Sequence, residues 1–313
     1  MCPGRRARVV ITGANGAVGL AILLRGPAER QTAFVAAVRS ERAAGEIRAR
    51  LGTSTSIARI SYDDPQSLRA AFAGASAVVH LAGVLVERPG SSYEEANVET
   101  TRKVVEAAKR SEVAKVVLVS SIGASESSTN RYWQTKGKAE ALVRQSGVPY
   151  TVLRAPMLLG PGTEGSATLR RNTSRAIAML IGGGKNLHQP LDVDDLARAA
   201  VAASQRSMAS NRTLDVVGPV SLTERQLVEH AGHLLGRHPR VWSIPKGCVS
   251  LLVAIGHLAT RGPGFSRDAL DVITADTRLD PQPAATTLGI ELTGLDEMIR
   301  RSLQPLPGPR AEL

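Results

Sequence analysis

The sequence predicts an α/β protein with a doubly wound parallel sheet (a Rossmann fold) and a smaller, mostly C-terminal region for substrate binding. Three observations predict it. The first half of the 313-residue chain alternates continuous apolar runs with amphipathic segments. A glycine-rich turn follows the first apolar run and opens the first amphipathic segment. The apolar content of 43% and charged content of 21% are typical of a folded globular chain.

The apolar runs of the first half indicate strands buried on both faces, because they do not alternate with polar residues. We expect strands at residues 8–12, 34–38, 77–81, 115–119 and 150–153. The segments between them predict helices at residues 17–24, 65–72, 93–110 and 135–145. Residues 1–156 therefore form the expected sheet domain.

The regular alternation of strands and helices weakens after residue 156. Glycine-rich segments at 160–165 and 182–184 predict loops, and the stretch 236–313 is proline-rich, helical and loop-rich. Later elements are expected at residues 192–204 (helix), 213–217 (strand) and 222–235 (helix). We expect 187–218 to return to the sheet domain, whereas 157–186 and 219–313 form the substrate-binding and helical region.

The net charge of +11 is uneven, with +9 in residues 1–155 and +2 in residues 156–313. A basic balance favours nucleic acid, a membrane surface or a phosphorylated ligand as partner. Only nine residues are aromatic, which argues against stacking on single-stranded nucleic acid, so no nucleic-acid partner is expected. Arginine supplies 32 of the 39 basic residues, and a solvated, arginine-biased surface accounts for part of the excess.

The two cysteines, Cys2 and Cys248, form no disulfide framework or zinc pattern, as in proteins of a reducing compartment. Glycines interrupt the apolar run near the N-terminus, unlike a signal peptide. The other apolar run, 247–259, is shorter than the roughly 20 residues that span a bilayer. We therefore expect a cytoplasmic protein without an integral membrane segment.

Glycines 13, 16 and 19 follow the first strand at the spacing of a dinucleotide-binding turn. The first glycine permits the turn, the second lets the backbone approach a pyrophosphate, and the third lets helix pack on strand. Free helix amides then face the phosphates. The residues expected to contact the dinucleotide here are Gly13, Asn15, Gly16, Ala17, Val18 and Gly19.

The end of the second strand indicates which dinucleotide binds. NAD-binding sheets place an acidic residue there for the ribose 2′-hydroxyl, whereas an arginine suits a 2′-phosphate. This chain has Arg39, so NADP(H) is expected over NAD(H), although Glu41 or Arg42 is an alternative neighbour. Asp63 is expected at the adenine edge; the alternative is that the Asp63 region only starts the next helix through Asp64 and Pro65.

Seven segments together resemble the short-chain dehydrogenase/reductase superfamily, in its extended or atypical branch. They are TGANGAVG (12–19), HLAG (80–83), VSS (119–121), YWQTK (132–136), LRAPMLLGPG (153–162), QPLDVDDLA (189–197) and LDVVGPVSLTERQL (214–227). The resemblance covers residues 1–235 and implies that Leu81, Ala82, Gly83 and Pro156 also contact the cofactor. The later segments look like the NADPH-binding accessory subunit group of respiratory complex I.

Tyr132 and Lys136 are four residues apart and lie on one face of a helix. A free phenol has a pKa near 10, too high for efficient proton transfer at neutral pH. We expect the ammonium of Lys136 and the positive nicotinamide to lower the pKa of Tyr132. The resemblance implies that Tyr132 is the proton donor or acceptor, that Lys136 also binds the nicotinamide ribose, and that both contact the cofactor.

Ser121 ends a parallel strand, where open sheets bind ligands, and is expected to orient the substrate oxygen. Ser120 competes for that role. Asn97 matches a family asparagine on the fourth helix, but Thr100 replaces the small residue usual nearby, and a helix kink is its alternative role. Thr135 stands where the family often has serine, a change without expected consequence.

The expected function is an NADP(H)-dependent oxidoreductase that transfers hydride to or from a carbonyl or alcohol. The first alternative is an NADPH-binding structural or regulatory subunit, or assembly protein, without turnover. Nucleotide-sugar epimerase or dehydratase chemistry is the second, which the 11-residue interval from Ser121 to Tyr132 disfavours because it leaves no room for a sugar-binding insertion. A small-molecule substrate is expected beyond Pro156, and the long helices make a homodimer possible.

Three clusters of like residues have simpler explanations than catalysis. No metal is expected, because the neighbouring histidines lack carboxylate or cysteine companions. Acidic residues at the start of a helix serve capping and the helix dipole. The arginines are expected on a solvated helix face. The clusters are His230, His233 and His238; Asp192, Asp194 and Asp195; and Arg170, Arg171 and Arg175.

Overall fold

The computed structural model describes residues 6–26, 29, 31–81, 83–205, 207–208, 210–249 and 266–304. Its centre is a seven-stranded sheet with the order β11-β6-β5-β4-β1-β2-β3. Each strand pairs with its neighbours in parallel. The strands are β1 (Ala7–Thr12), β2 (Thr32–Val38), β3 (Ser56–Arg59), β4 (Ala77–His80), β5 (Val116–Ser121), β6 (Tyr150–Ala155) and β11 (Arg212–Asp215). The doubly wound parallel sheet predicted from the sequence is thereby confirmed.

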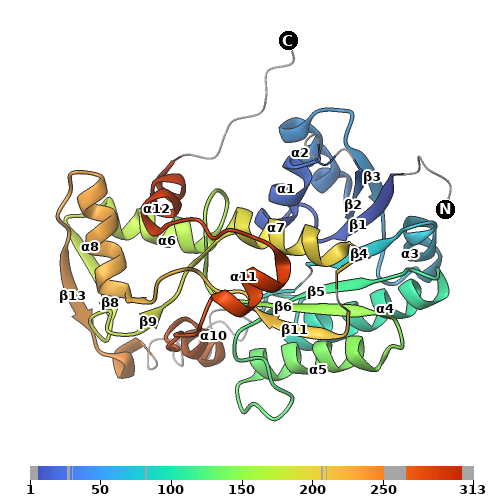
Figure 1. The fold of residues 1–313 in the computed structure, drawn as a ribbon. Coiled ribbons are helices and arrows are strands. Elements are labelled where there is room, and N and C mark those ends of the chain that lie inside the picture. Colours follow the sequence, from blue (N-terminus) through green and yellow to red (C-terminus); the bar gives the residue numbers. More distant parts are fainter. Residues whose placement is uncertain are drawn as a thin grey trace.

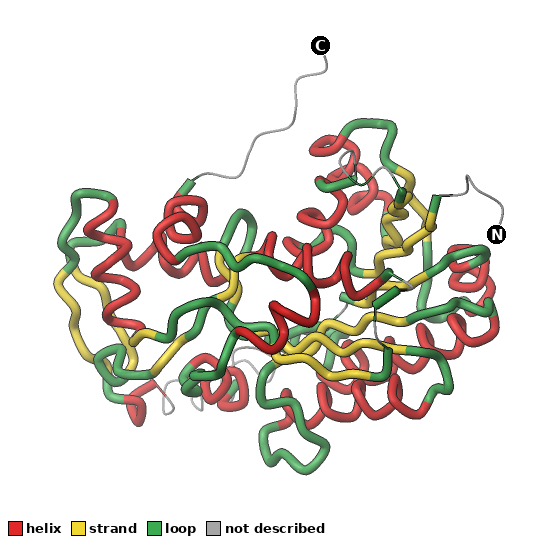
Figure 2. Tube along the Cα trace, viewed as in Figure 1, coloured by secondary structure: helices red, strands yellow, loops and turns green. Residues whose placement is uncertain are grey.

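Helices cover both faces of this sheet (Figures 1 and 2). One face packs against α1 (Ala17–Leu24), α2 (Glu41–Leu51) and α7 (Val193–Ser204). The other packs against α3 (Pro65–Phe72), α4 (Thr100–Arg110) and α5 (Arg131–Gln145). Successive strand residues feed the two cores in turn, as Val9 and Ile11 face one and Val10 the other. This burial on both faces explains the continuous apolar runs.

A second region lies at the left of Figure 1. It contains α6 (Glu164–Thr173), α8 (Glu224–Leu234) and α12 (Leu295–Leu303), together with the parallel pair β8 (Ile177–Ile181) and β13 (Arg240–Ile244). These elements share a small apolar core of their own. Two short helices, α10 (Arg267–Ile273) and α11 (Gln282–Leu288), lie towards the sheet. The remaining pairs are β10 (Leu191–Asp192) with β7 (Leu158–Leu159) and β12 (Leu222–Thr223) with β9 (Leu187–His188).

The structure corrects several expected elements. Helix α5 begins at Arg131 instead of residue 135, because the Asn130 side chain accepts from the Trp133 amide at 3.2 Å and caps the helix. The expected helix at 93–110 is a π-helix, η1 (Glu94–Glu99), followed by α4. The sequence analysis did not predict α2, β3, α6 or β13, and α6 begins within the expected loop at 160–165.

Candidate active site

The glycine turn joins β1 to α1 at the carboxyl edge of the sheet. Gly13 has a φ of 72°, and a Cβ at Gly19 would lie 2.5 Å from the Ala14 carbonyl oxygen, so this turn requires glycine at both positions. Gly16 is the N-cap of α1, where no side chain bonds the first amides and no acidic residue stands in the first turn. The helix amides are therefore left for an anion, and a pyrophosphate fits this cradle.

Arg39 follows β2, and its side chain is exposed. Among the described residues it forms no hydrogen bond or ion pair, whereas nearby Arg42 pairs with Glu46 at 3.0 Å and Glu41 pairs with Arg48 and Arg59. Of these three candidates at the strand end, Arg39 therefore keeps its charge available for a ligand.

Asp63 lies in the turn before α3, where its carboxylate pairs with Lys103 at 2.8 Å. That hydrogen bond lowers the pKa of Asp63. Capping of α3 is the work of Asp64, which accepts from the Gln66 amide at 2.9 Å with Pro65 in the first turn. The two neighbouring carboxylates thus have separate roles.

Tyr132, Ser121 and Lys136 come together at the carboxyl end of β5. The Ser121 hydroxyl lies close enough to the Tyr132 phenol to lower the pKa of that phenol. Ser121 Oγ donates its hydrogen to the Ile122 carbonyl oxygen at 3.1 Å. Ser120 is buried, and its hydroxyl has no partner among the described residues. The pairing with Tyr132 therefore belongs to Ser121.

Burial dominates the electrostatics of Tyr132 in the protein alone. It raises the pKa of the phenol, and the nearby Ser121 hydroxyl only partly offsets that rise. Lys136 does not lower it, since its ammonium donates to the Val119 carbonyl oxygen at 3.0 Å. In the protein alone Tyr132 is therefore a neutral phenol at neutral pH, and the lowering of its pKa next to a bound nicotinamide stays a prediction.

Lys136 is itself buried, and this burial lowers its pKa to about 8, against the opposing effect of Glu140 one turn along α5. Glu140 is fully buried and holds two arginines, accepting from Arg154 at 2.7 and 2.9 Å and from Arg144 at 3.1 Å. The Glu140 carboxylate is thus buried one helical turn from Lys136.

A lysine whose pKa is lowered on folding makes stability rise with pH. Below pH 8 the ammonium is protonated in both states and its burial costs free energy; above pH 8 the folded state releases the proton first. We expect the free energy of unfolding of the native protein, taken relative to that of Lys136→Met, to rise by on the order of 3 kcal/mol between pH 7 and 10.5. Urea unfolding at stepped pH measures the difference. A constant difference across that range would contradict the buried ammonium.

Asn97 lies in the π-helix and faces both the cofactor-side loop and helix α5. Its Oδ1 accepts from the Val84 amide at 3.2 Å, and its Nδ2 donates to Thr135 Oγ1 at 3.0 Å. A Cβ at Gly83 would lie 2.8 Å from Asn97 Oδ1 and 3.6 Å from Lys136 Nζ, so Gly83 lies against both side chains. Asn97 therefore lies in an irregular helix, and its role as a site residue stays a prediction.

The remaining expected cofactor residues lie along the same sheet edge. Leu81 follows β4 and its amide donates to the Thr12 carbonyl oxygen at 3.1 Å. Pro156 directly follows β6. Ala82 lies outside the described residues.

The C-terminal region contacts the start of α5. Asp268 of α10 accepts from the Arg131 amide at 3.0 Å through Oδ1, and its carbonyl oxygen accepts from Asn130 Nδ2 at 3.0 Å. Tyr93 bonds Ser266 at 3.2 Å, and its ring meets that of Tyr132 edge-on with centroids 5.8 Å apart. These long-range contacts anchor the helix end that carries Tyr132.

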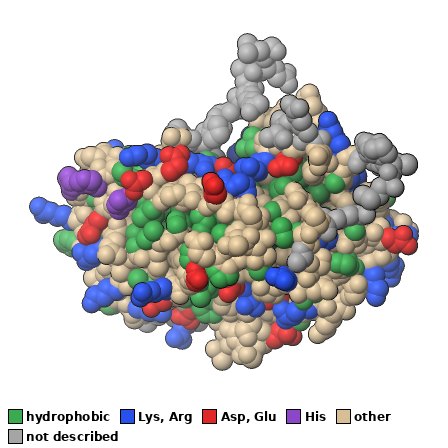
Figure 3. Space-filling model, in the orientation of Figure 1, with side chains coloured by type: hydrophobic (Ala, Val, Ile, Leu, Met, Phe, Trp, Pro, Cys, Tyr) green, Lys and Arg blue, Asp and Glu red, His purple; other side chains and the backbone are tan. Residues whose placement is uncertain are grey.

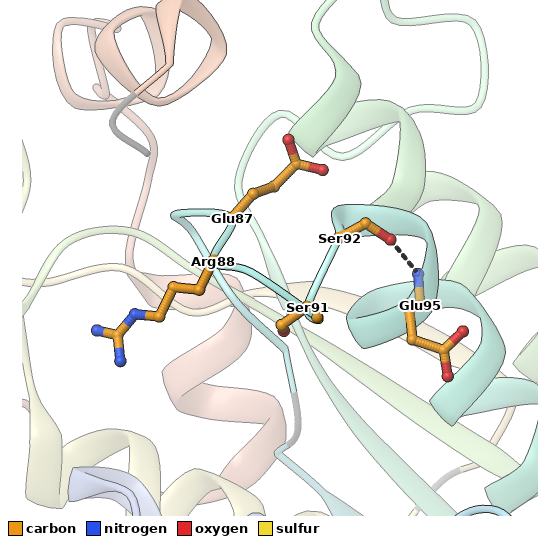
Figure 4. Close-up of a pocket in the computed structure, with 6 residues that line it drawn as sticks. Glu87, Arg88, Ser91, Ser92 and Glu95 are labelled. Carbon is orange, nitrogen blue, oxygen red and sulfur yellow. Dashed lines mark hydrogen bonds between the residues drawn. The ribbon is translucent and has the colours of Figure 1, made fainter. Parts of the chain in front are cut away.

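A shallow pocket of about 410 Å³ lies beside the loop between β4 and η1 (Figure 4). Its lining residues are Glu87, Arg88, Gly90, Ser91, Ser92 and Glu95. In Figure 4 the side chains of Glu87 and Arg88 point to opposite sides of the loop. None of the six lining residues is among the predicted site residues, so this pocket is separate from the Ser121–Tyr132 pair.

The clusters set aside in the sequence have structural partners. Among the described residues no group of three potential metal ligands occurs, and His230 bonds Asp296 at 2.7 Å. Asp192 caps α7, and burial raises its pKa to about 6. Arg170 donates to the Ser302 carbonyl oxygen at 3.3 Å. On the face shown in Figure 3, Lys and Arg are interspersed with Asp and Glu. No helix in the described part of the chain is long and apolar enough to cross a membrane.

Sheet order, glycine cradle and residues at the carboxyl edge define a dinucleotide-binding protein of the Rossmann class. The chain belongs to the NAD(P)H-binding family, whose model matches residues 13–205. The resemblance to short-chain dehydrogenases/reductases is confirmed.

Curated relatives differ in their activities. The chain is 28% identical to NADH dehydrogenase (ubiquinone) 1 alpha subcomplex subunit 9 of Arabidopsis thaliana, over 68% of this chain and 56% of that protein. It is 26% identical to ceramide reductase of Caulobacter vibrioides, over 58% of this chain and 57% of that protein. The chain thus spans little more than half of either. A cinnamoyl-CoA reductase of Oryza sativa is 29% identical over 75% of this chain and 78% of that protein.

Solved structures share the fold over nearly the whole chain. UDP-glucuronic acid 4-epimerase from Bacillus cereus has a TM-score of 0.73 at 17% identity, covering 95% of this chain and 98% of the epimerase. UDP-glucose 4-epimerase from Bifidobacterium longum has a TM-score of 0.73 at 15% identity, covering 95% and 97%.

Proposed function

We propose that this protein is an NADP(H)-dependent oxidoreductase that transfers hydride between the nicotinamide and a carbonyl or alcohol. The observation that carries the proposal is the convergence of Ser121, Tyr132 and Lys136 at the carboxyl edge of the sheet, where Lys136 Nζ donates to the Val119 carbonyl oxygen at 3.0 Å. Hydroxyls paired at this edge can hold one substrate oxygen between them. A nucleotide-binding scaffold without turnover has no need of such a pair.

The residues divide the chemistry as follows. A bound nicotinamide supplies or accepts the hydride. Ser121 and Tyr132 donate hydrogen bonds to the substrate oxygen, and Tyr132 supplies the proton that converts a carbonyl to an alcohol. Because burial raises the pKa of Tyr132, the phenol carries that proton at neutral pH, which favours reduction. Lys136 binds the nicotinamide ribose, and Asn97 orients the Gly83–Val84 loop at the same edge.

We assign the dinucleotide to the glycine turn and the strand ends around it. The proposed contacts are Gly13, Asn15, Gly16, Ala17, Val18, Gly19, Arg39, Asp63, Leu81, Gly83, Tyr132, Lys136 and Pro156, with Ala82 retained from the sequence motif. The open amides of α1 support the pyrophosphate position. Lys103 binds only Oδ1 of the exposed Asp63 side chain, which leaves Oδ2 for the adenine edge.

The availability of Arg39 supports NADP(H) over NAD(H). We expect Arg39→Gln to raise the Kd for NADPH at least about tenfold, because a charge-assisted bond to a phosphate is lost, and to leave the Kd for NADH unchanged. Thermal-shift titration with both nucleotides measures this. Arg42→Gln is the matched control, since its side chain pairs with Glu46 and its loss should alter neither Kd. Tighter binding of NADH than NADPH by the native protein would contradict the assignment.

We further propose that residues 157–186 and 219–313 bind the substrate, that 187–218 belong with the sheet domain, and that α4 and α5 pair in a homodimer. The pairing of β11 with β6 supports the return of 187–218. The separate apolar core of α6, α8 and α12 supports a distinct substrate region. A cytoplasmic location remains our inference from the cysteine pattern.

A nucleotide-binding subunit without turnover is the second candidate, favoured by similarity to the Arabidopsis complex I subunit. A panel of aldehydes and ketones, followed at the NADPH absorbance, separates the two. Oxidation of NADPH with any member supports the enzyme. Tight NADPH binding without oxidation across the panel, together with co-purification with a membrane complex, supports the subunit. Epimerase chemistry is a further candidate, favoured by the fold shared with the Bacillus cereus epimerase. Conversion of a nucleotide sugar without net NADPH consumption would support it.

A further inference from the structure

His80, the last residue of β4, is fully buried between the glycine turn and the π-helix. Its Nδ1 lies 2.6 Å from Thr12 Oγ1, and Thr12 is the residue before Gly13. Its Nε2 lies 3.2 Å from Thr101 Oγ1, in the first turn of α4. The imidazole therefore bridges two segments that are far apart in the chain and that both border the proposed site.

The directions of these hydrogen bonds follow from the inventory of donors. Thr101 has one hydroxyl hydrogen and gives it to the Asn97 carbonyl oxygen at 2.6 Å, which can only accept. Thr101 Oγ1 must then accept from Nε2–H of His80. Nδ1 is left as the acceptor and receives the hydrogen of Thr12. Burial and the charge of Lys136 lower the pKa of His80 to about 3, so the ring stays neutral in this tautomer.

The bond from Thr101 fixes the backbone of the π-helix at the residue whose side chain points to the site. Asn97 presents its amide to the Val84 N–H and to Thr135, and Thr135 Oγ1 in turn bonds the Tyr132 carbonyl oxygen at 2.9 Å. A continuous series of buried side chains thus runs from the glycine turn to the helix that carries Tyr132 and Lys136.

We propose that His80 is a positioning residue, whose neutral Nε2–H imidazole couples the glycine turn to Asn97 and, through Thr135, to helix α5. Both ring nitrogens of a buried histidine need partners, and here the two partners belong to segments on either side of the proposed site. The structural part of this proposal concerns the protein alone, whereas its effect on turnover rests on the proposed function.

The test compares His80→Leu, His80→Gln and Thr101→Val by amide hydrogen exchange in the nucleotide-free protein. The leucine variant removes both bonds, glutamine retains one acceptor and one donor, and valine removes only the Thr101 hydroxyl. We expect exchange at Val84 and over 97–101 to be about tenfold faster in His80→Leu and Thr101→Val, and nearly native in His80→Gln. Where His80→Leu does not fold, Thr101→Val supplies the comparison.

Imidazole ¹⁵N spectra give a second readout, expected to show neutral Nε2–H at pH 6. The Nδ1–H tautomer, an imidazolium at pH 6, or native exchange at Val84 in folded Thr101→Val would overturn the proposal. If the native protein oxidises NADPH, we expect kcat to be about tenfold lower in Thr101→Val and nearly native in His80→Gln. If the variants exchange faster but the native protein oxidises no NADPH, the positioning role of His80 is supported and the proposed oxidoreductase function is rejected.

Discussion

Tyr132→Phe is expected to lower kcat for carbonyl reduction by about a thousandfold, since general acid catalysis contributes roughly 10²- to 10⁴-fold. The substitution removes one oxygen atom and keeps the ring that packs edge-on against Tyr93. The fold should therefore persist, and the Kd for NADPH should change far less than kcat. The rate of single-turnover NADPH oxidation, compared with the Kd for NADPH, separates lost chemistry from lost binding.

Tyr150→Phe is the matched control for this experiment. Tyr150 begins β6, its partly buried ring packs against the apolar core on the α3–α5 side of the sheet, and none of the hydrogen bonds at Ser121 involves it. The same chemical change there should leave kcat within about twofold. Undiminished turnover of a carbonyl by Tyr132→Phe would exclude Tyr132 as the proton donor.

Glu140→Gln is expected to lower the free energy of unfolding by about 3 kcal/mol, because removing one member of a buried ion pair leaves its partners uncompensated. Glu140 is fully buried, while Arg154 and Arg144 are 27% and 36% exposed, which places the cost at the lower end of the usual range. The pKa of Lys136 should also fall, since Glu140 opposes the effect of burial there.

Urea unfolding at pH 7 measures this loss, and Glu126→Gln is the control. Glu126 pairs with the same Arg144 at 3.4 Å but is 55% exposed, so its removal should cost less than about 1 kcal/mol. Equal losses in the two variants would show that burial of Glu140 adds nothing. A lower pKa of Lys136 in Glu140→Gln would steepen the rise of stability with pH, relative to a variant that also carries Lys136→Met, between pH 7 and 8.

Local patterns were sufficient to predict the sheet and the glycine turn, because continuous apolar strands and glycine spacing are properties of neighbouring residues. The bounds of α1 and α3 match the expected helices at 17–24 and 65–72. Helix α2 escaped prediction because its buried face consists only of Ala43, Ala44 and Ile47, a weak apolar periodicity. Strand β3 has no fully buried residue.

The candidate site was predictable residue by residue but not in its connections. The pairing of Ser121 with Tyr132 depends on how β5 and α5 meet in space, and a sequence carries no direct sign of it. The π-helix depends on contacts of Asn97 with Val84 and Thr135, far along the chain. His80 was visible only as part of a motif, and an irregular helix was foreseen only as the alternative role of Asn97.

The contacts of Asp268 with Asn130 and Arg131 have a consequence for biosynthesis. These partners are 138 and 137 residues apart, so a ribosome emits the second roughly ten seconds or more after the first. The nascent sheet and its glycine turn can form in that interval, and α5 then lacks its C-terminal anchor. The emerging chain should accordingly bind a dinucleotide before it can turn over a substrate.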